Sequence, residues 1–354
     1  MVNSVAKDDD WQLYCNYTQP RALLERFGGH WPATELDGPA RALMRALAPR
    51  PVSTWGLRER ARLPQRQLGR TLERLQAMRL VRRTRDRVML DFPLLTAESL
   101  SNEEKEAVST LVDRALRLLI LPLWELASEL VELRPGASWA EWGWALLAPI
   151  LGNLWAESAG LRDVAFGVGR ELPHLRYRLV PCSPQIAVGY PEGHRFPMAR
   201  ELGMLFAQPA VRQSLGTAEA DGRLMVQESS RASLAEAGML RGSRTAHEMD
   251  YRLTVPLLEP GLLQPLEGVL RALCGALARA LRETEPVLRA AYRRGSFAHL
   301  EDAGSRDWVA AILTVAAGLL ADRLVEEELL AAPVRRKITV RDAGEEAGSG
   351  VVLQ

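Results

Sequence analysis

The residues best suited to chemistry in this chain are arginines that lie opposite leucines on one predicted helix. At about 100° per residue, the helix 65–78 has one apolar face, formed by Leu68, Leu72 and Leu75. Arg66 and Arg70 fall on the opposite face. Leucine faces pack against neighbouring helices, whereas guanidinium groups near a helix N-terminus can donate to guanine O6 and N7 in the major groove of DNA. The pattern therefore predicts a helix that contacts base edges.

Further polar residues of the same segment suit contacts with bases or phosphates. Gln65 and Gln67 stand at the helix start and suit adenine or a phosphate, and Gly69 allows close approach of the backbone. Arg74 lies on the flank of the arginine face. Phosphate contacts position a protein on the duplex, and the arginines expected to make them are Arg82, Arg83, Arg85 and Arg87.

The local charge favours a polyanionic partner. Between Arg41 and Arg87 the chain has 14 arginines and three acidic residues, a net charge of +11, while the whole chain carries only +1 and the other 307 residues carry −10. A GC-rich coding sequence accounts for arginine in place of lysine. It does not account for uncompensated charge in one segment, because clustered like charges repel one another unless a polyanion is present. An arginine-rich solvated surface is the alternative.

Three predicted helices and two predicted strands would position these residues. The pattern predicts helices in the stretches "GPARALMRALAP", "VSTWGLRERARLP" with Ser53 or Thr54 as N-cap, and "PQRQLGRTLERLQAMR" with Pro64 at its start. "LVRRT" and "RVMLD" alternate as two strands joined by a tight turn at Arg85-Asp86. Three helices followed by a hairpin are the layout of a winged helix-turn-helix.

These residues resemble the bacterial winged helix-turn-helix regulators of the MarR/ArsR type. The resemblance covers about 55 of 354 residues and rests on Leu63-Pro64, Leu68, Leu72, Leu75 and Leu80-Val81-Arg82-Arg83. It implies a DNA-binding domain over 38–93 and double-stranded DNA as partner. The sequence departs from the family at two places. Arg79 replaces a glycine and must adopt the C-cap geometry of one, and the Arg85-Asp86 tip implies a short wing.

The rest of the chain predicts a mainly α-helical protein, with a larger, mostly helical α+β domain over 100–332. Before the basic segment, 1–37 is predicted to be an N-terminal arm with one short helix closed by Gly28-Gly29, and 333–354 a mobile tail. Long helices are expected after Ser101, with a kink at Pro122, and over 261–283. Strands are expected in "LRYRLVP", "QIAVGYP", "GRLMVQES" and "HEMDYRLTVPL".

A homodimer and a ligand are further expectations. Palindromic DNA sites are read by dimers, so the helix after Ser101 and the helix 261–283 are either dimer elements or part of the domain's own core. Four tryptophans are predicted to line a pocket for a small apolar or aromatic ligand, or else to lie in a core or interface: Trp124, Trp139, Trp142 and Trp155.

Other classes of protein find little support in the sequence. The three cysteines are far apart and show no zinc or disulfide spacing, and the histidines occur singly, so neither metal nor cofactor is expected. No phosphate-binding loop, nucleophile elbow or zinc-protease motif is present, so no enzyme is expected. The start of the chain does not read as a signal peptide, and the uncharged runs Trp142–Ala156 and Trp308–Ala321 are short for a membrane helix.

The sequence thus predicts a cytoplasmic, dimeric DNA-binding transcriptional regulator. The alternative is an interaction or scaffold protein whose winged helix contacts partners or nucleic acid without sequence specificity.

Overall fold

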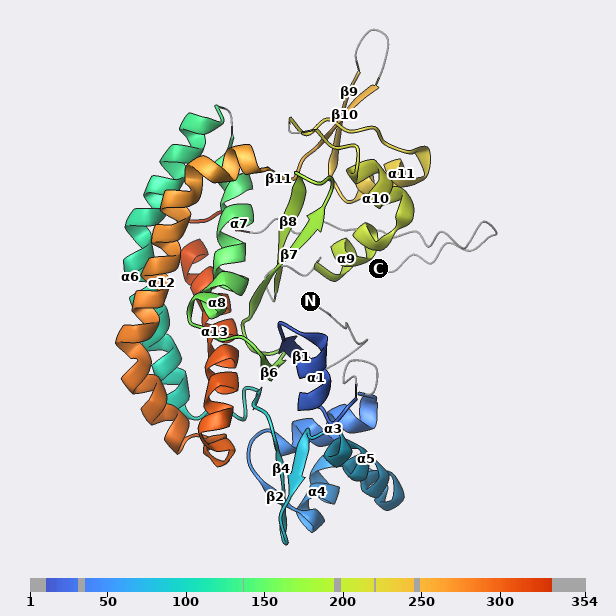
Figure 1. Ribbon diagram of the computed structural model, residues 1–354, viewed down its shortest axis with the longest axis vertical. Helices are drawn as coiled ribbons and strands as arrows, with labels where there is room; N and C mark the ends of the chain where they lie inside the picture. The colour runs from blue at the N-terminus through green and yellow to red at the C-terminus, as the bar shows by residue number, and fades with distance from the viewer. Residues whose placement is uncertain are drawn as a thin grey trace. The chain divides into compact units, whose positions relative to one another are not determined.

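The computed structural model describes residues 11–30, 36–135, 137–193, 199–219, 221–244 and 249–332. They form a mostly helical structure with several small sheets (Figure 1), which confirms the mainly helical class predicted from the sequence. The chain divides into two compact units, each made of separate segments. The first comprises Met1–Leu121, Ile150–Leu175 and Ala272–Leu324, and the second Pro122–Pro149, Arg176–Arg271 and Val325–Gln354.

The predicted domain boundaries stay a prediction. The segment 38–93 lies wholly within the first unit, whereas 100–332 is shared between the two. The predicted tail, 333–354, lies outside the described residues.

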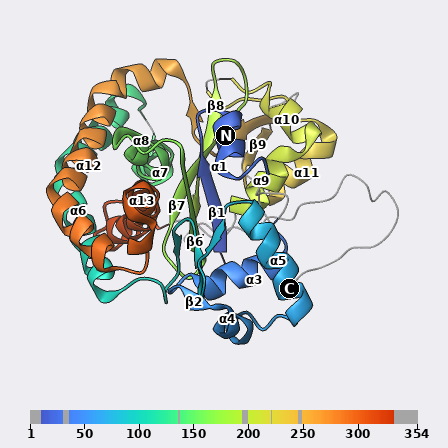
Figure 2. The same cartoon turned by 60° about the horizontal axis from the view of Figure 1, so that its bottom comes forward.

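Three helices and a three-stranded sheet follow one another between residues 38 and 90 of the first unit (Figure 2). In chain order they are α3 (Gly38–Leu47), β2 (Val52–Ser53), α4 (Thr54–Ala61), α5 (Gln65–Ala77), β3 (Val81–Arg83) and β4 (Arg87–Leu90). The strands are antiparallel in the order β2-β4-β3. The three predicted helices and two predicted strands are confirmed, and β2 is a further short strand.

The starts of these helices are determined by local sequence. The carboxylate of Asp37 accepts the Ala40 N–H at 2.9 Å and caps α3, and the Ser53 hydroxyl accepts the Gly56 N–H at 3.1 Å and caps α4. At the start of α5, the Leu68 N–H donates to the Pro64 carbonyl. One face of each helix enters a common core whose fully buried members include Leu43, Met44, Leu57, Leu75 and Val88. This core fixes the orientation of α5.

The end of α5 confirms the prediction for Arg79. Arg79 has a φ of 52°, in the left-handed region, and the Leu80 N–H donates to the Leu75 carbonyl at 2.9 Å, as in a Schellman turn. A side chain costs about 1–2 kcal/mol in this conformation. The Arg79 guanidinium also donates to the Glu25 carbonyl at 3.2 Å, so the residue joins two segments of the first unit while it strains its own backbone.

We expect Arg79→Gly to be about 1 kcal/mol more stable than Arg79→Ala. Both variants lose the hydrogen bond to Glu25, but only glycine adopts the left-handed conformation without a steric cost. Urea unfolding of the two variants measures the difference in free energy. Equal stabilities would contradict the left-handed turn at this residue.

A second sheet of the first unit joins distant parts of the chain. Its strands are β1 (Trp11–Asn16), β6 (Val164–Gly169) and β5 (Leu94–Leu95), in the order β1-β6-β5, with β1 antiparallel and β5 parallel to β6. Gly167 leaves no room for a side chain, because an added Cβ would lie 2.5 Å from Leu94. Neither β1 nor β6 was predicted. The N-terminal arm therefore contains a sheet strand as well as the predicted helix, α1 (Pro20–Arg26).

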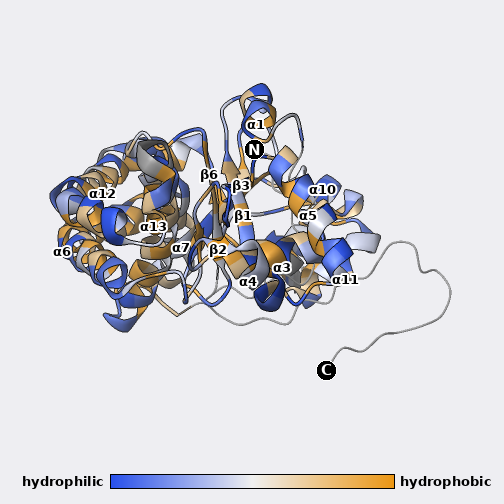
Figure 3. Ribbon diagram, turned by 90° about the horizontal axis from the view of Figure 1, so that it is seen from below, coloured by the Kyte–Doolittle hydropathy of each residue, from blue (hydrophilic) through white to orange (hydrophobic). Residues whose placement is uncertain are grey.

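The long helices agree with the sequence pattern but extend further. They are α6 (Asn102–Leu133), α12 (Pro260–Arg294) and α13 (Glu301–Glu326), with the shorter α7 (Trp139–Pro149), the π-helical turn Ile150–Leu154, α8 (Trp155–Ser158) and the 3₁₀ turn Ala298–Leu300 between them in the chain. Pro122 lies inside α6, which continues through it. Hydrophilic and hydrophobic residues are interleaved along α6 and α12 (Figure 3). The predicted leucine face of α12 is buried in the chain's own core, including Leu266, Leu273 and Leu277 at 0% exposure.

The second unit holds the remaining strands and short helices. A sheet in the order β11-β8-β7 is built from β7 (Leu175–Pro181), β8 (Ala187–Gly193) and β11 (Leu257–Leu258), and a hairpin from β9 (Leu240–Arg244) and β10 (Met249–Leu253). The helices are α9 (Ala199–Ala207), α10 (Pro209–Leu215) and α11 (Glu228–Glu236).

The strand predicted in "GRLMVQES" is wrong. Only Arg223 forms an isolated bridge, to Arg252, and α11 begins within the predicted strand at Glu228. The hairpin strand β9 was missed, and the other three predicted strands are present.

One helical stretch, Gly304–Glu326 of α13, is long and apolar enough to cross a membrane by length and composition. It includes the uncharged run noted in the sequence. Of its most apolar window, 67% is buried inside the protein, as in the core helix of a soluble protein. This helix is therefore weak evidence for a membrane segment.

A buried carboxylate lies where α13 meets β6 in the first unit. Asp307 is 6% exposed, accepts the Ala165 N–H at 3.3 Å and lies 3.5 Å from the Arg26 guanidinium. Burial raises the pKa of Asp307 to about 6, although Arg26 opposes the shift. The folded protein thus holds a proton on Asp307 at pH values where the unfolded chain has lost it.

We expect Asp307→Asn to remove a pH dependence of stability. Because the folded pKa is above the unfolded one, the folded state binds more protons between about pH 4 and pH 6, so stability is lost as the pH rises through that window. The difference in unfolding free energy between wild type and variant should fall by roughly 2.5 kcal/mol from pH 4 to pH 7. Urea titrations at each pH measure it, and a constant difference would contradict the raised pKa.

Candidate nucleic-acid interface

The helix α5 has one buried and one exposed face, as the sequence predicted. Leu68, Thr71, Leu72 and Leu75 are buried in the core shared with α3 and α4. The polar residues predicted to contact DNA are exposed along the helix: Gln65, Arg66, Gln67, Gly69 and Arg70. An added Cβ at Gly69 would meet nothing within 4 Å, so this glycine leaves open space on the helix surface.

Arg66 and Arg70 lie one helical turn apart on that face. Neither makes a hydrogen bond or ion pair with any other residue that the structure describes. Guanidinium groups without an internal partner keep all their N–H donors for a ligand, and such donors can pair bidentately with guanine O6 and N7.

The turn before α5 is tight and depends on a second strained arginine. Arg62 ends α4 with a φ of 52°, and its N–H donates to the Arg58 carbonyl at 3.2 Å. Leu63 and Pro64 complete the turn, and Pro64 stands at the N-cap position of α5. Two helices joined by three residues hold the N-terminus of α5 at the surface, where its first residues are free to contact a ligand.

The hairpin after α5 presents a second set of arginines. Arg83 of β3 pairs with Val88 of β4, and the Thr84 N–H donates to the Arg87 carbonyl at 2.8 Å, which closes a two-residue turn at Arg85-Asp86. Arg83, Arg85 and Arg87 are exposed, whereas Val88 is buried. The hairpin is as short as the sequence predicted.

Two of the ten predicted contact residues have structural partners instead. Arg74 pairs with Asp37 at 2.5 Å. Burial alone would raise the pKa of Asp37, but hydrogen bonds from Arg74 and from the Ala40 N–H lower it. Arg82 donates to the His299 carbonyl at 3.1 Å and lies 3.9 Å from Asp91. The sequence predicted DNA contacts for both arginines, and these further partners could not be predicted because they are distant in the sequence.

The charge of the basic segment is partly compensated from outside it. Arg45 pairs with Glu171, Arg74 with Asp37 and Arg82 with Asp91, and none of these acids lies between residues 41 and 87. Arg41 is buried and lies over the Trp11 ring at 5.0 Å. The charge of +11 therefore overstates what is offered to a ligand. The remaining charge includes the exposed arginines of α5 and the hairpin, and also Arg58, Arg60 and Arg62 in and directly after α4.

One exposed residue of this region was missed in the sequence. Trp55, in the first turn of α4, is 74% exposed, more than Trp124, another strongly exposed tryptophan of the described residues. A large aromatic ring two residues after the capping Ser53, on a helix whose apolar positions are otherwise Leu57 and Ala61, was the available signal. A ring at this position can pack on a sugar or a base.

The structure does not bring the four tryptophans of the predicted ligand pocket together. Trp155 is fully buried in the first unit and donates to the Leu277 carbonyl, whereas Trp139 of the second unit donates to the Leu329 carbonyl. Trp124 is 65% exposed. The four tryptophans are spread over residues 124–155, and the helical turns between them direct the rings to different surroundings.

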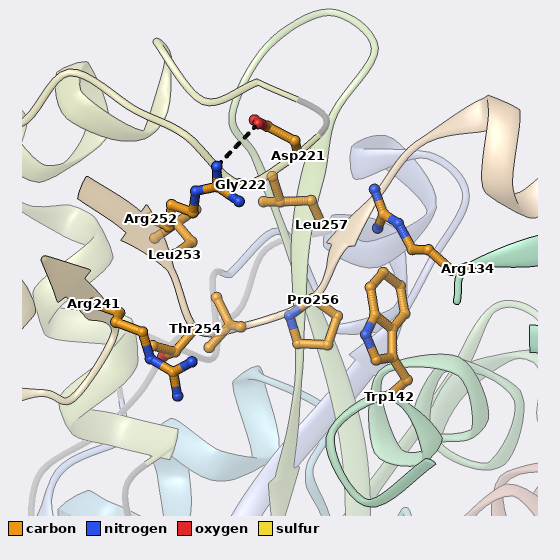
Figure 4. Close-up of a pocket in the computed structure, with 11 residues that line it drawn as sticks. Arg134, Trp142, Asp221, Gly222, Arg241, Arg252, Leu253, Thr254, Pro256 and Leu257 are labelled. Atoms are coloured by element: carbon orange, nitrogen blue, oxygen red, sulfur yellow. Dashed lines mark ion pairs between the residues drawn. The ribbon is translucent and has the colours of Figure 1, made fainter. Parts of the chain in front are cut away.

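Trp142 lines a cavity of the described residues (Figure 4). This cavity of about 210 Å³ lies in the second unit, where the Arg134 guanidinium stacks 5.1 Å from the Trp142 ring and pairs with Glu259. Arg252, on the far side of Pro256 in the view, pairs with Asp221. The volume is below the usual range for ligand pockets, about 300–1,000 Å³, and two of the three arginines that line it, Arg134 and Arg252, already have carboxylate partners.

Within the described residues, no group of three or more His, Cys, Asp or Glu side chains is placed to hold a metal ion. Burial raises the pKa of the Cys182 thiol to about 11, which makes this cysteine a poor nucleophile at neutral pH.

Comparison with known proteins adds no assignment. No protein-family model, curated protein or solved structure matches this chain.

Proposed function

We propose that the protein binds double-stranded DNA through α5 and the β3–β4 hairpin, as a winged helix-turn-helix. The observation that carries the proposal is the pair Arg66 and Arg70, exposed on the face of α5 opposite its packed leucines and without a partner among the described residues. The arginines of the hairpin extend the same positive charge. In this proposal α5 enters the major groove and the hairpin contacts phosphates.

The element order supports this reading. Helix, strand, helix, helix and a two-stranded hairpin, with β2 added to the hairpin sheet, give α5 the position of a recognition helix. The hairpin turn has only two residues, so we assign it contacts with the backbone and not deep insertion into the minor groove.

We further propose a transcriptional regulator that acts as a homodimer in the cytoplasm, by binding and not by catalysis. A dimer would place two α5 helices on the half-sites of a palindrome. The leucine face of α12 is already buried in the chain's own core, so we do not assign it to the dimer. Sedimentation equilibrium would establish the number of chains in solution.

A protein that binds nucleic acid without sequence specificity is the second candidate. The abundance of arginine on the surface favours this candidate, because contacts with phosphates alone would explain the positive charge without any contact to bases. The two candidates differ in specificity. A regulator binds its site about 10³-fold or more tightly than random DNA, whereas the alternative binds all duplexes equally.

Selection of bound sequences from a pool of random DNA duplexes tests the proposal. We expect one enriched motif, and binding to it that exceeds binding to random DNA at the same salt concentration. No enrichment together with salt-dependent binding would support the second candidate, and no binding at low salt would contradict both.

Arg85→Ala should weaken binding to every duplex by a similar factor. The side chain is exposed at the hairpin tip, and a phosphate contact carries no sequence information. Loss of one such contact should reduce the slope of log K against log salt by about 1. Fluorescence anisotropy at several salt concentrations measures the slope. A change in the selected motif would show instead that Arg85 contacts a base.

A further inference from the structure

The first unit contains a second cavity, much larger than the one beside Trp142. Its volume is about 900 Å³, within the range of ligand pockets. It is lined by the second half of α12, the start of α13 and the end of α8. The lining residues of α12 run from Ala278 to Arg293, a length of about 22 Å along the helix at 1.5 Å per residue. The cavity is therefore an elongated groove.

The base of this groove is apolar. Leu281 and Val309 are half-buried there, and Ala298 is exposed. Beneath them the rings of Tyr292 and Trp308 pack at 5.3 Å between centroids and are nearly fully buried. The base thus offers rigid apolar surface to an aliphatic or aromatic body.

The edge of the groove is strongly cationic. Four arginines and a single acidic residue, Glu285, belong to the lining: Arg282, Arg289, Arg293 and Arg306. Arg289 pairs with Glu285 at 2.6 Å, and Arg306 donates to the Gly160 carbonyl at 2.8 Å. Arg289 and Arg306 therefore already have hydrogen-bond partners within the protein.

Arg282 and Arg293 differ from the other arginines of α12, of which Arg294 donates to the Ala290 carbonyl at 3.2 Å. Arg271, Arg279 and Arg289 each pair with a glutamate four residues away. Arg282 and Arg293 have no acidic residue at that spacing in the sequence, and neither makes a hydrogen bond or ion pair with another residue in the described part of the chain.

The placement of Arg282 and Arg293 points to an anion as the ligand. Arg282 and Arg293 are 11 residues apart, close to three full turns, so they lie on the same side of α12. Two cations along one edge of an apolar groove are complementary to an anion that carries an apolar body.

We propose that this groove binds an amphipathic carboxylate, a free organic acid with a long aliphatic chain. The chain would lie on the base of Leu281 and Val309, and the carboxylate would accept hydrogen bonds from Arg282 or Arg293. This inference goes beyond DNA binding and does not depend on it, because it rests on different residues.

Calorimetric titration of the full-length protein with dodecanoate, below its micelle concentration and without DNA, tests the proposal. We expect saturable binding to the wild type, weaker binding of the neutral analogue dodecanol, and no binding of acetate. Arg282→Ala/Arg293→Ala should weaken binding of dodecanoate by about tenfold or more, as expected for the loss of a charge-assisted hydrogen bond. Both side chains are exposed, so this variant should retain the fold.

Two further variants separate the site from general effects. Arg271→Ala/Arg279→Ala removes the same charge from α12 outside the lining and should bind dodecanoate as the wild type does. Ala278→Phe keeps all four arginines but fills the groove, and it should also weaken binding. Equal binding by the wild type and Arg282→Ala/Arg293→Ala would overturn the proposal. The proposal would also be overturned if the protein bound phosphatidylglycerol vesicles but did not bind free dodecanoate.

Discussion

Replacing both Arg66 and Arg70 by alanine is expected to abolish the preference of the protein for its selected DNA site over random DNA. Each bidentate contact between an arginine and a guanine contributes about 1–3 kcal/mol of discrimination, so the loss of two contacts should lower the ratio of affinities by between about thirtyfold and twenty-thousandfold. Fluorescence anisotropy with the selected site and with a scrambled duplex, at one salt concentration, measures the ratio.

The structure makes this variant a clean test. Both arginines are exposed on α5 and have no partner in the described part of the protein, so their loss should leave the melting temperature nearly unchanged. Arg271→Ala/Arg279→Ala provides the matched control, because it removes two exposed arginines from another helix. If the affinity ratio survives in Arg66→Ala/Arg70→Ala, the assignment of α5 as the recognition helix is wrong.

Removing the side chain of Glu104 is expected to be the most destabilising single change considered for this protein. The carboxylate of Glu104 is fully buried, accepts the Ser101 N–H at 2.8 Å and accepts the Trp308 indole N–H at 3.1 Å. The Glu104 N–H donates back to the Ser101 hydroxyl, which completes a capping box at the start of α6. Burial raises the pKa of Glu104, and the hydrogen bonds from Ser101 and Trp308 oppose that shift.

Glu104→Ala would leave the buried Trp308 indole N–H and the partly buried Ser101 N–H without their acceptor, and it would create a cavity beside Trp308. Each unsatisfied buried group costs about 1–3 kcal/mol, so we expect a total loss of roughly 3–5 kcal/mol in the free energy of unfolding. The neighbouring Glu103, exposed in the same helical turn, provides the control. Glu103→Ala should cost only about 0.3–1 kcal/mol, through the helix dipole. Similar losses in the two variants, measured by urea unfolding, would contradict this role.

The elements that carry the candidate interface could be predicted from the sequence because their signals are local. Asp37, Ser53 and Pro64 mark the helix starts, and the leucines of α5 recur at helical spacing. The exposed positions of Arg66 and Arg70 follow directly from that spacing, since whatever lies opposite a buried face faces solvent. The left-handed conformation of Arg79 also followed from a pattern of a few residues.

The strands β1 and β6 could not be predicted in the same way. Each has six residues, and the two pair over a separation of about 150 positions, with Trp11 opposite Gly169. Neither strand alternates cleanly between polar and apolar residues. In β6 there is no alternation because the strand is buried on both faces. The opposite error occurred at residues 222–229, where a predicted strand is a loop and the start of α11.

The sequence by itself determined which residues of α5 and the hairpin face outward, where these elements begin and end, and that positive charge gathers there. The tertiary structure alone decided which arginines remain available to a ligand. Arg74 and Arg82 are engaged by Asp37, His299 and Asp91, and the four tryptophans are dispersed among different surroundings. The physical reason is the distance along the sequence over which each kind of interaction acts. Caps and helical periodicity act over a few residues, whereas a salt bridge or a shared core depends on segments that only folding brings together.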